Sequence, residues 1–234
     1  MRATPPVITI DGPSGCGKGT VAHRLAVALG WRVLDSGVVY RAMALSIDRA
    51  HLAPTEESTV LAHLAHVNIQ LVQPNPSDET AVFLETDNVT DHIRSERCSQ
   101  LASLIAQFPG VRAAALPYQR MYRVWPGLIA DGRDMGTVVF PDAPLKFFLD
   151  AAVEERAHRR HTQLIRRGVV VSFESVLSEM EKRDYQDRTR LVAPTLPAAD
   201  AIILDTTHLS VEDVFDRMLT IAQRTFVSTK VTSS

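Results

Sequence analysis

The sequence predicts an α/β protein with a parallel sheet flanked by helices. Three observations indicate this class. Short apolar runs alternate with helical patterns along most of the 234 residues, a glycine-rich segment joins the first strand to the first helix, and charged residues follow the strand ends. With 45% hydrophobic and 22% charged residues, the chain has the composition and length of one folded domain with insertions.

Short apolar runs that end in a polar residue predict the strands of the sheet. The run Val7-Ile8-Thr9-Ile10-Asp11 has the continuous apolar character of a buried strand. Strands are expected at residues 7–11, 32–36, 127–131, 145–150 and 201–205. Because helices separate them, these strands should run parallel, and ligands should bind at their carboxyl ends.

Apolar residues at helical spacing predict the helices. In the first helix Val21, Leu25 and Leu29 recur four residues apart, and Gly30 is a favourable stop. Helices are expected at residues 18–29, 37 to about 50, 56–64, 95–108, 111–122, 153–167, 173 to about 188 and 211–223. The polar tail, residues 229–234, is expected to fray.

Residues 67–90 interrupt the alternation of strand and helix. Val67, Ile69 and Leu71 alternate with polar residues, which is the period of a strand. A second strand is expected at residues 81–84, with turns at residues 74–78 and 87–88. The pattern predicts a small antiparallel insertion beside the main sheet.

The segment between the first strand and the first helix has the pattern of a phosphate-binding loop. Its glycines leave room for backbone N–H groups to point at phosphate oxygens, and the helix that follows presents its positive dipole end. Lys18 supplies a positive charge for the outer phosphates, and Thr20 offers a hydroxyl to the helix start or to a magnesium shell. The loop comprises Gly12, Pro13, Ser14, Gly15, Cys16, Gly17, Lys18, Gly19 and Thr20. The alternative is a glycine-rich turn that binds nothing.

Charged residues gather where a phosphate ligand would lie. Asp11, Ser36, Asp131 and Asp150 stand at predicted strand ends, and the segment Asp131-Gly132-Arg133-Asp134 has three charges in four residues. A solvated loop is the alternative for that segment. Arginines occur at positions 41, 112, 156, 159, 160, 166, 167, 183, 188 and 190. One arginine alone suggests a surface salt bridge, but this set beside a phosphate loop predicts a clamp for a nucleotide triphosphate.

Composition and missing motifs argue against several other classes. A net charge of −2 gives no bulk attraction to nucleic acid or membrane. Two distant cysteines, Cys16 and Cys98, and the absence of a long apolar stretch or signal peptide lead us to expect a cytoplasmic protein. A switch GTPase would need an Asn-Lys-x-Asp motif, which the chain lacks. An ATP-driven motor or nucleic-acid-processing protein is disfavoured by the charge and by the single compact domain.

Motifs spread along the chain occur together in one known family of enzymes. They are the loop 12–20, in which Gly19 separates Lys18 from Thr20; Leu34-Asp35-Ser36-Gly37 with Tyr40-Arg41; residues 130–136; Phe148-Leu149-Asp150; and Glu155-Arg156-Ala157-His158-Arg159-Arg160. Arg183-Asp184, Asp187-Arg188, Arg190 and residues 197–201 continue the match. Over about residues 5–222 the chain resembles the bacterial cytidylate kinases, which belong to the nucleoside monophosphate kinases.

The resemblance implies a P-loop kinase fold with a monophosphate-binding insertion and a short lid. The whole chain, residues 1–234, is then a single domain. Its core would comprise about residues 1–36, 126–151 and 169–234, its insertion about 37–125, and its lid about 152–168. The implied reaction is phosphoryl transfer from ATP to CMP or dCMP, with Mg²⁺ as cofactor, in a monomer that binds no nucleic acid or membrane.

The resemblance also implies roles for individual residues. The ATP phosphates would be held by Lys18 and the amides of the loop, and Mg²⁺ by Thr20 and Asp131, directly or through water. The CMP site would comprise Ser36 and Tyr40; Arg41, Arg133 and Arg190 on the phosphate; Ser103, Arg112 and Asp134 on the cytosine; and Arg183 and Asp187 on the sugar. Arg156, Arg159 and Arg160 would belong to a lid that closes over ATP. Catalysis is expected from Lys18, Arg133, Arg159, Arg160 and Arg190. The alternatives left open are another nucleoside monophosphate kinase, for UMP or AMP, a shikimate kinase, and a switch GTPase.

Overall fold

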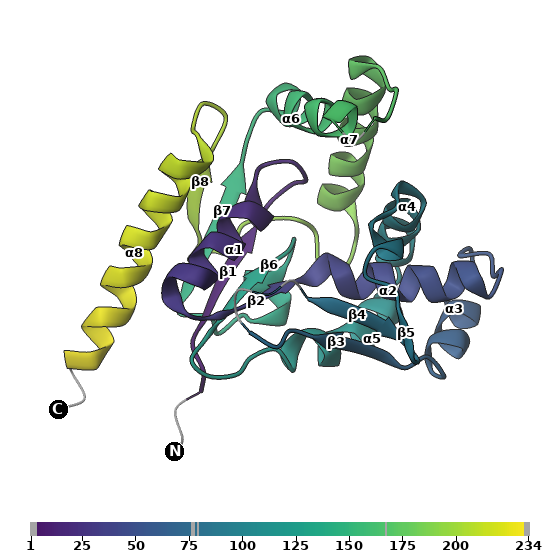
Figure 1. Cartoon of the computed structure of the whole chain (residues 1–234), viewed down its shortest axis with the longest axis horizontal. Helices are drawn as coiled ribbons and strands as arrows, with labels where there is room; N and C mark the ends of the chain where they lie inside the picture. The colour runs from purple at the N-terminus through teal and green to yellow at the C-terminus, as the bar shows by residue number, and fades with distance from the viewer. Residues whose placement is uncertain (1–3, 76–77, 79, 167, 232–234) are drawn as a thin grey trace.

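Five parallel strands form the central sheet of the protein (Figure 1). The structure is a computed structural model that describes residues 4–75, 78, 80–166 and 168–231. The strands are β1 (Val7–Asp11), β2 (Arg32–Asp35), β6 (Leu128–Asp131), β7 (Leu145–Asp150) and β8 (Ile202–Asp205). They lie in the order β2-β6-β1-β7-β8, and every neighbouring pair is parallel. The predicted α/β class with a parallel sheet is confirmed.

The central strand β1 is buried on both faces, as its apolar run predicts. Ile8 and Ile10 pack beneath the helices α1 (Lys18–Leu29) and α8 (Val211–Val231). Val7 points to the opposite face and packs with Phe140, which follows the π-helical turn Met135–Val139. Because both faces are covered, ligands can reach the sheet only at its edges and strand ends.

The segment between β2 and β6 forms a separate body beside the sheet. Its helices are α2 (Ser36–Arg49), α3 (Glu57–Leu64), α4 (Glu96–Ile105) and α5 (Pro109–Arg120), and a 3₁₀ turn spans His92–Arg94. Its antiparallel strands are β3 (Ile69–Val72), β4 (Ala81–Leu84) and β5 (Asp87–Asn88). Ile47, Val60, Val82 and Ile105 form part of its own buried cluster. This insertion lies to the right of the sheet in Figure 1.

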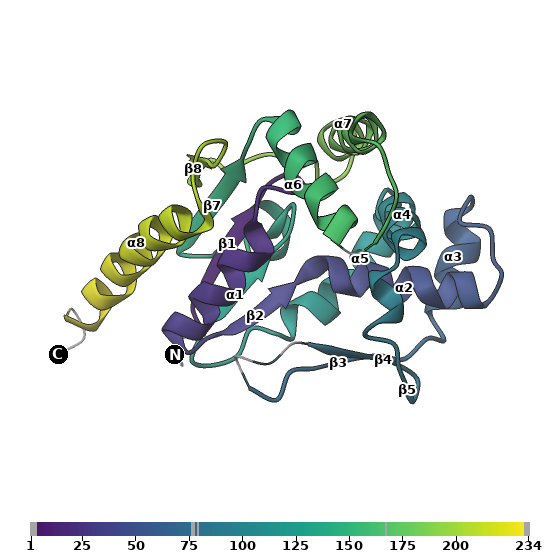
Figure 2. The ribbon, with the colours of Figure 1, turned by 45° about the horizontal axis from the view of Figure 1, so that its top comes forward.

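After β7 the chain forms a helical hairpin. Helix α6 (Val153–Arg166) packs on α7 (Phe173–Thr189) through Ala157, Val176 and Met180. Figures 1 and 2 show this hairpin beyond the carboxyl end of the sheet, with the insertion across from it. The expected lid helix therefore has α7 as a packed partner. Arg167, which was expected to end that helix, lies outside the described residues.

The structure corrects two expectations in the insertion and its start. Residues 87–88 were expected to form a turn, but they form β5 and pair with Phe83 and Leu84. The turn lies at residues 85–86, just before β5, and Glu85 in it has a φ of 54°. Ser36, expected at the end of a strand, is the first residue of α2, because the Asp35 carboxylate caps this helix by accepting a hydrogen bond from the Gly37 amide.

The C-terminal helix is longer than expected. The periodic pattern predicts an end at residue 223, with fraying from residue 229, whereas α8 continues to Val231. Phe226 extends the buried face of the helix, and its ring lies 5.0 Å from that of Trp31 in an edge-on arrangement. Within the described ranges, no helix is both long enough and apolar enough to cross a membrane.

Candidate active site

The loop between β1 and α1 needs glycine at three positions. Gly12, Gly15 and Gly17 have φ angles of 142°, 81° and 87°, which side chains rarely adopt. A Cβ atom at Gly12 would lie 2.0 Å from the Leu149 carbonyl oxygen. Gly17 is the N-cap residue of α1, so the helix begins with Lys18. The geometry is that of a backbone cradle at a helix N-terminus, as the motif predicts.

Lys18 lies folded against its own loop. The side chain is 6% exposed, and its Nζ donates to the Pro13 carbonyl at 2.6 Å. Cys16, which is also buried, donates from its thiol to the same carbonyl at 3.2 Å. Cys16 is therefore packed as a small residue within the loop. The Lys18 ammonium group has three N–H donors, so those not bonded to Pro13 are available to a ligand in the cavity that Lys18 lines.

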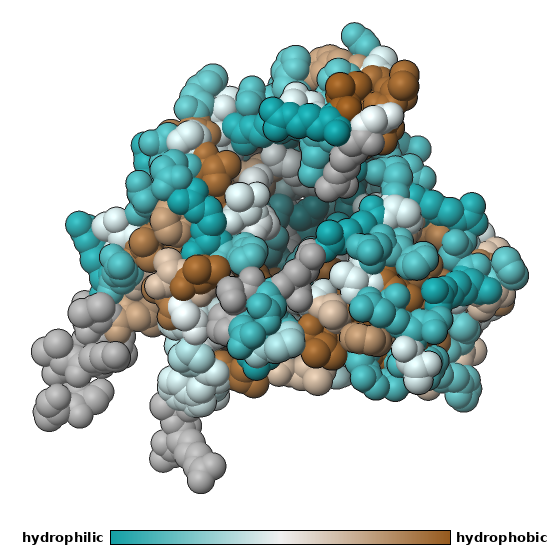
Figure 3. Space-filling model, in the orientation of Figure 1, coloured by the Kyte–Doolittle hydropathy of each residue, from teal (hydrophilic) through white to brown (hydrophobic). Residues whose placement is uncertain are grey.

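A cavity of about 330 Å³ opens directly in front of this loop. The space-filling view shows the surface hollowed between the α6–α7 hairpin and the insertion (Figure 3). Of the residues expected at the site, the cavity is lined by Ser14, Gly15, Gly17, Lys18, Gly19, Thr20, Ser36, Tyr40, Arg41, Ser103, Arg112, Asp131, Arg133, Asp134, Arg183, Asp187 and Arg190. The tertiary structure thus gathers residues that are up to 176 positions apart, from Ser14 to Arg190.

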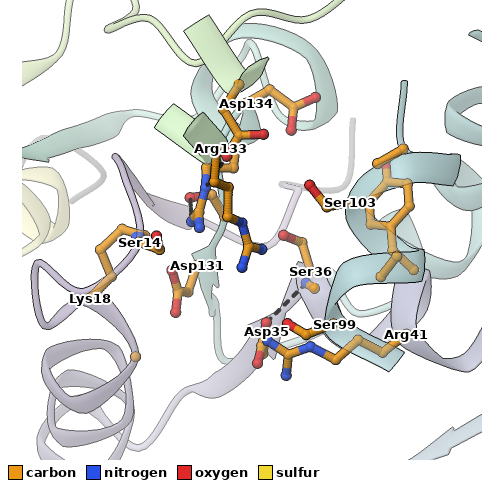
Figure 4. A pocket seen from close by; sticks show the side chains of 18 of the residues that line it. Ser14, Lys18, Asp35, Ser36, Arg41, Ser99, Ser103, Asp131, Arg133 and Asp134 are labelled. Atoms are coloured by element: carbon orange, nitrogen blue, oxygen red, sulfur yellow. Dashed lines mark hydrogen bonds and ion pairs between the residues drawn. The ribbon is translucent and has the colours of Figure 1, made fainter. Parts of the chain in front are cut away.

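Two carboxylates lie side by side at the edge of the cavity nearest the loop. Asp35 and Asp131 are partners in the register of β2 and β6, and both line the cavity. Asp131 lies between Lys18 and Asp35 (Figure 4), and its Oδ2 is 3.3 Å from the position of a Cβ at Gly19. Burial raises the pKa of Asp131 to about 6, while Lys18 lowers it and Asp35 adds to the rise.

Three arginines, Arg133, Arg183 and Arg190, line the same cavity. Arg133 and Arg190 both approach the carboxylate of Asp187, at 3.3 Å and 3.6 Å. The Arg183 Nε and the Arg190 Nη2 are buried and have no hydrogen-bond partner among the described residues. Burial lowers the pKa of Arg183 and of Arg190. Buried N–H groups without an acceptor are unfavourable, so an anion in this cavity would relieve that cost.

The far end of the cavity combines one buried ion pair with an aromatic ring. Arg112 of α5 pairs with Asp134, and both side chains are less than a tenth exposed. The Arg112 guanidinium carbon lies 5.6 Å from the centroid of the Tyr40 ring. Arg112 also donates to the Ala106 carbonyl at the end of α4, the helix that carries Ser103. This end therefore offers one acceptor, one donor and an apolar face.

Six of the loop and lid residues singled out from the sequence do not line this cavity, as far as the described chain goes. Gly12, Pro13 and Cys16 are buried within the protein, and the other three are Arg156, Arg159 and Arg160. Arg159 donates to the carbonyls of Thr206 and Thr207, and Arg160 pairs with Glu96 of α4 at 2.8 Å.

The structure buries Arg156, one of the three arginines expected in the lid. This side chain is 2% exposed. It donates to the carbonyls of Ala151 and Ser14 and to the Asp184 carboxylate at 2.5 Å. Arg156 thus fastens α6 to both α7 and the phosphate-binding loop. A sequence pattern cannot distinguish such a buried arginine from an exposed one on the same helix.

Sequence reasoning assigned no site role to two polar side chains that line the cavity. Asp35 lies at the end of β2, where strand-end logic could have found it, but that logic selected its neighbour Ser36. Ser99 faces the cavity one helical turn before Ser103. A four-residue spacing of serines on α4 was the available signal.

A phosphate-binding loop at the carboxyl end of a parallel sheet, with a group of arginines lining the same cavity, defines a P-loop kinase. The chain matches the family model described as cytidylate kinase over residues 8–224. It belongs to the cytidylate kinase family.

Named relatives agree with the family match. The chain is 51% identical over 224 residues to a protein named cytidylate kinase from Citrobacter koseri. The alignment covers 96% of this chain and 98% of that protein. It is 50% identical to one of the same name from Yersinia pestis, with 96% of each chain covered. A gluconokinase structure from Sinorhizobium meliloti 1021 aligns over both full chains with a TM-score of 0.46 and 13% identity, which is too low to carry an argument.

Proposed function

We propose that this chain transfers the terminal phosphoryl group of ATP to CMP or dCMP, giving ADP and CDP or dCDP. The observation that carries the proposal is one cavity that combines a phosphate-binding loop with a group of arginines. The loop with Lys18 lines this cavity together with Arg133, Arg183 and Arg190. A kinase whose acceptor is itself a phosphate needs such an arrangement, because both reactants carry negative charge.

The residues supply positioning and charge neutralisation for the transfer. An oxygen of the CMP phosphate is already ionised, so its attack on the γ-phosphorus needs no general base. Lys18 would stabilise the negative charge on the phosphoryl group during its transfer. Arg41, Arg133 and Arg190 would hold the CMP phosphate in line, while Arg183 and Asp187 would contact the sugar.

The residues beside the loop fit Mg²⁺. Thr20 and Asp131 present a hydroxyl and a carboxylate, the hard oxygen donors that this ion prefers. The described residues hold no cluster of three or more His, Cys, Asp or Glu side chains suited to a metal, so ATP and water would supply the remaining ligands. When bound, Mg²⁺ supplies charge neutralisation at the ATP phosphates. Asp131 would hold the ion directly or through water.

Closure of the hairpin would complete the ATP site. Water must be excluded during transfer, since otherwise ATP is hydrolysed. Arg159 and Arg160 lie on α6 next to the cavity but bond to Thr206, Thr207 and Glu96 in this structure. We infer that they exchange these partners for ATP when α6 and the insertion approach each other. In this proposal the lid, about residues 152–168, and the insertion, about residues 37–125, move relative to the core that carries the sheet.

Base selection distinguishes this function from related kinases. Cytosine presents an amino donor where uracil presents a carbonyl, and a carboxylate such as Asp134 can only accept. Ser103 and Arg112 would contact the remaining polar atoms of the ring. We expect CMP and dCMP to be preferred over UMP, and AMP and GMP to be excluded by size. The monomeric state and cytoplasmic location stay predictions.

A nucleotide panel with ATP as donor tests the proposal. The initial rate of ADP formation is measured by a coupled assay with CMP, dCMP, UMP, AMP and GMP as acceptors. The highest kcat/KM should belong to CMP and dCMP. An equal kcat/KM for UMP, or a preference for AMP, would assign the chain to another nucleoside monophosphate kinase.

A further inference from the structure

Asp11 is a buried carboxylate to which the mechanism above gives no role. It is the last residue of β1, directly before Gly12, and it is 4% exposed. Burial raises its pKa to about 7, although hydrogen bonds from the Gly136 and Met135 amides act in the opposite direction. Keeping a carboxylate at this position is unfavourable for folding, because an apolar side chain would avoid the desolvation.

The carboxylate of Asp11 uses both of its oxygens on one short segment. Its Oδ1 accepts from the Met135 amide at 2.7 Å, and its Oδ2 accepts from the Gly136 amide at 2.8 Å. These two amides open the π-helical turn Met135–Val139. A single side chain from β1 therefore holds the start of a turn that lies 124 residues further along the chain.

The same contact reaches Asp134 through the backbone. Asp134 immediately precedes the turn, with φ and ψ of −145° and 25°, and its side chain pairs with Arg112. Gly136, two residues after Asp134, packs closely against β1. A Cβ atom at this position would lie 2.8 Å from the Thr9 Oγ1 and 3.3 Å from the Asp11 Oδ2. The backbone on the C-terminal side of Asp134 is thus fixed, which leaves its carboxylate few directions in which to point.

We propose that Asp11 is a positioning residue for base selection, which acts by holding Met135 and Gly136 and thereby aiming Asp134 at the base. This inference rests on the proposed function and deepens it. Asp11 touches no substrate. It joins the start of the phosphate-binding loop to the segment that selects the base, so both halves of the cavity share one anchor on β1.

Asp11→Asn tests the assignment. The amide keeps one acceptor but sets an NH₂ group against a backbone N–H, so one of the two contacts is lost. We expect the CMP-to-UMP ratio of kcat/KM to fall about 10-fold, mainly through KM for CMP, with KM for ATP within about twofold of wild type. Thr9→Val is the matched control on the same strand, because the buried Thr9 Oγ1 has no partner in the described chain. It should leave all three values unchanged.

A double variant separates an effect through Asp134 from a general loosening. If Asp11 acts through Asp134, Asp11→Asn combined with Asp134→Asn should discriminate no worse than Asp134→Asn alone. Should Asp11→Asn fail to fold, as circular dichroism would reveal, Gly136→Ala disturbs the same contact from the other side. It should produce the same loss of discrimination.

The outcomes separate this assignment from the proposed function. A wild-type protein that does not prefer CMP overturns both. A wild-type preference that persists in Asp11→Asn, or in Gly136→Ala where the first variant does not fold, overturns the positioning role alone. Additive losses in the double variant also overturn it, since they show that Asp11 acts independently of Asp134.

Discussion

Arg112 and Asp134 form a buried ion pair between α5 and the segment that follows β6. Their side chains are 8% and 5% exposed, and both line the cavity in front of the phosphate-binding loop. A buried pair is strongly destabilised when one partner is removed, because the other charge is left uncompensated. The pair therefore presents a fixed donor and a fixed acceptor to a base.

Asp134→Asn should weaken the preference for CMP over UMP. The amide can donate to O4 of uracil, whereas the carboxylate can only accept from the cytosine amino group. We expect the CMP-to-UMP ratio of kcat/KM to fall about 10-fold or more, in line with the loss of one buried hydrogen-bond match. Asp142→Asn is the control, because Asp142 pairs with Arg123 at the surface. Undiminished discrimination in Asp134→Asn would contradict the assigned role.

Lys18→Ala should lower turnover and leave CMP affinity nearly intact. Loss of one group that stabilises charge on the transferring phosphoryl group reduces kcat by about 10²–10³. Steady-state kinetics give kcat, and calorimetry gives the dissociation constant of CMP. Lys182→Ala on the exposed face of α7 is a matched control. Near-wild-type turnover in Lys18→Ala would remove the phosphate-binding interpretation of the loop.

Replacing Arg159 and Arg160 together by alanine should reduce turnover more than CMP binding. Both side chains are expected to meet ATP only when the hairpin closes, and they bond to other protein groups in this structure. We expect kcat to fall about 10-fold or more, with the dissociation constant of CMP within about twofold. Arg49→Ala, which breaks a surface pair with Asp87, serves as the control. Lost CMP affinity with normal turnover would show that these arginines do not belong to a lid.

Asp187→Ala should weaken CMP more than its 2′,3′-dideoxy analogue. The carboxylate is expected to accept a hydrogen bond from a sugar hydroxyl, which the analogue lacks. Asp187 also pairs with Arg133 and Arg190, so part of the loss will be common to both nucleotides. The fold-increase in KM caused by the substitution is measured for each nucleotide. The increase for CMP should exceed that for the analogue by about fivefold or more, and this factor isolates the sugar contact.

Equal losses for the two nucleotides would give Asp187 a purely structural role. The structure identifies that role as an acceptor for Arg133 and Arg190. Arg183 lies four residues earlier on α7, a spacing that also permits an ion pair, but Asp187 pairs with Arg133 and Arg190 in the structure. Asp48→Ala, which breaks the surface pair with Arg97, is the control.

Asp131→Asn should change how stability depends on pH. Burial raises the pKa of Asp131 from 3.8 to about 6 in the folded protein. A raised pKa means that the carboxyl stabilises the fold fully below about pH 4, and that this contribution is lost as the pH rises through 6. The free energy of unfolding of Asp131→Asn, relative to that of the wild type, should therefore rise by about 2 kcal/mol between about pH 4.5 and pH 7.5.

Urea unfolding of the nucleotide-free protein at both pH values measures this difference. Asp142→Asn is the matched control, because Arg123 holds the pKa of Asp142 below its usual 3.8. Its difference from wild type in free energy of unfolding should stay constant between the two pH values, because a carboxyl with a lowered pKa titrates below this range. If the stability difference between Asp131→Asn and wild type does not change with pH, the pKa of Asp131 in the folded protein is not raised.

Local pattern was sufficient to predict the phosphate-binding loop, the five strands of the sheet and most helices. Each depends on neighbours in the chain: glycine where φ is positive, apolar runs where both faces are buried, and four-residue spacing where a helix has one buried face. The strand-end residue Asp131 was found in the same way, because parallel strands bring their carboxyl ends to one edge.

Contacts between distant segments were decided only by the tertiary structure. An arginine can pair with many carboxylates, and sequence spacing does not say which one the packed elements will bring within reach. Arg156 was expected in the lid, and only the packing of α6 against α7 shows that it is buried on Asp184. Asp11, recognised only as a strand end, turns its carboxylate to amides 124 and 125 residues away. Such partners are chosen by the way whole elements pack, which no single stretch of sequence contains.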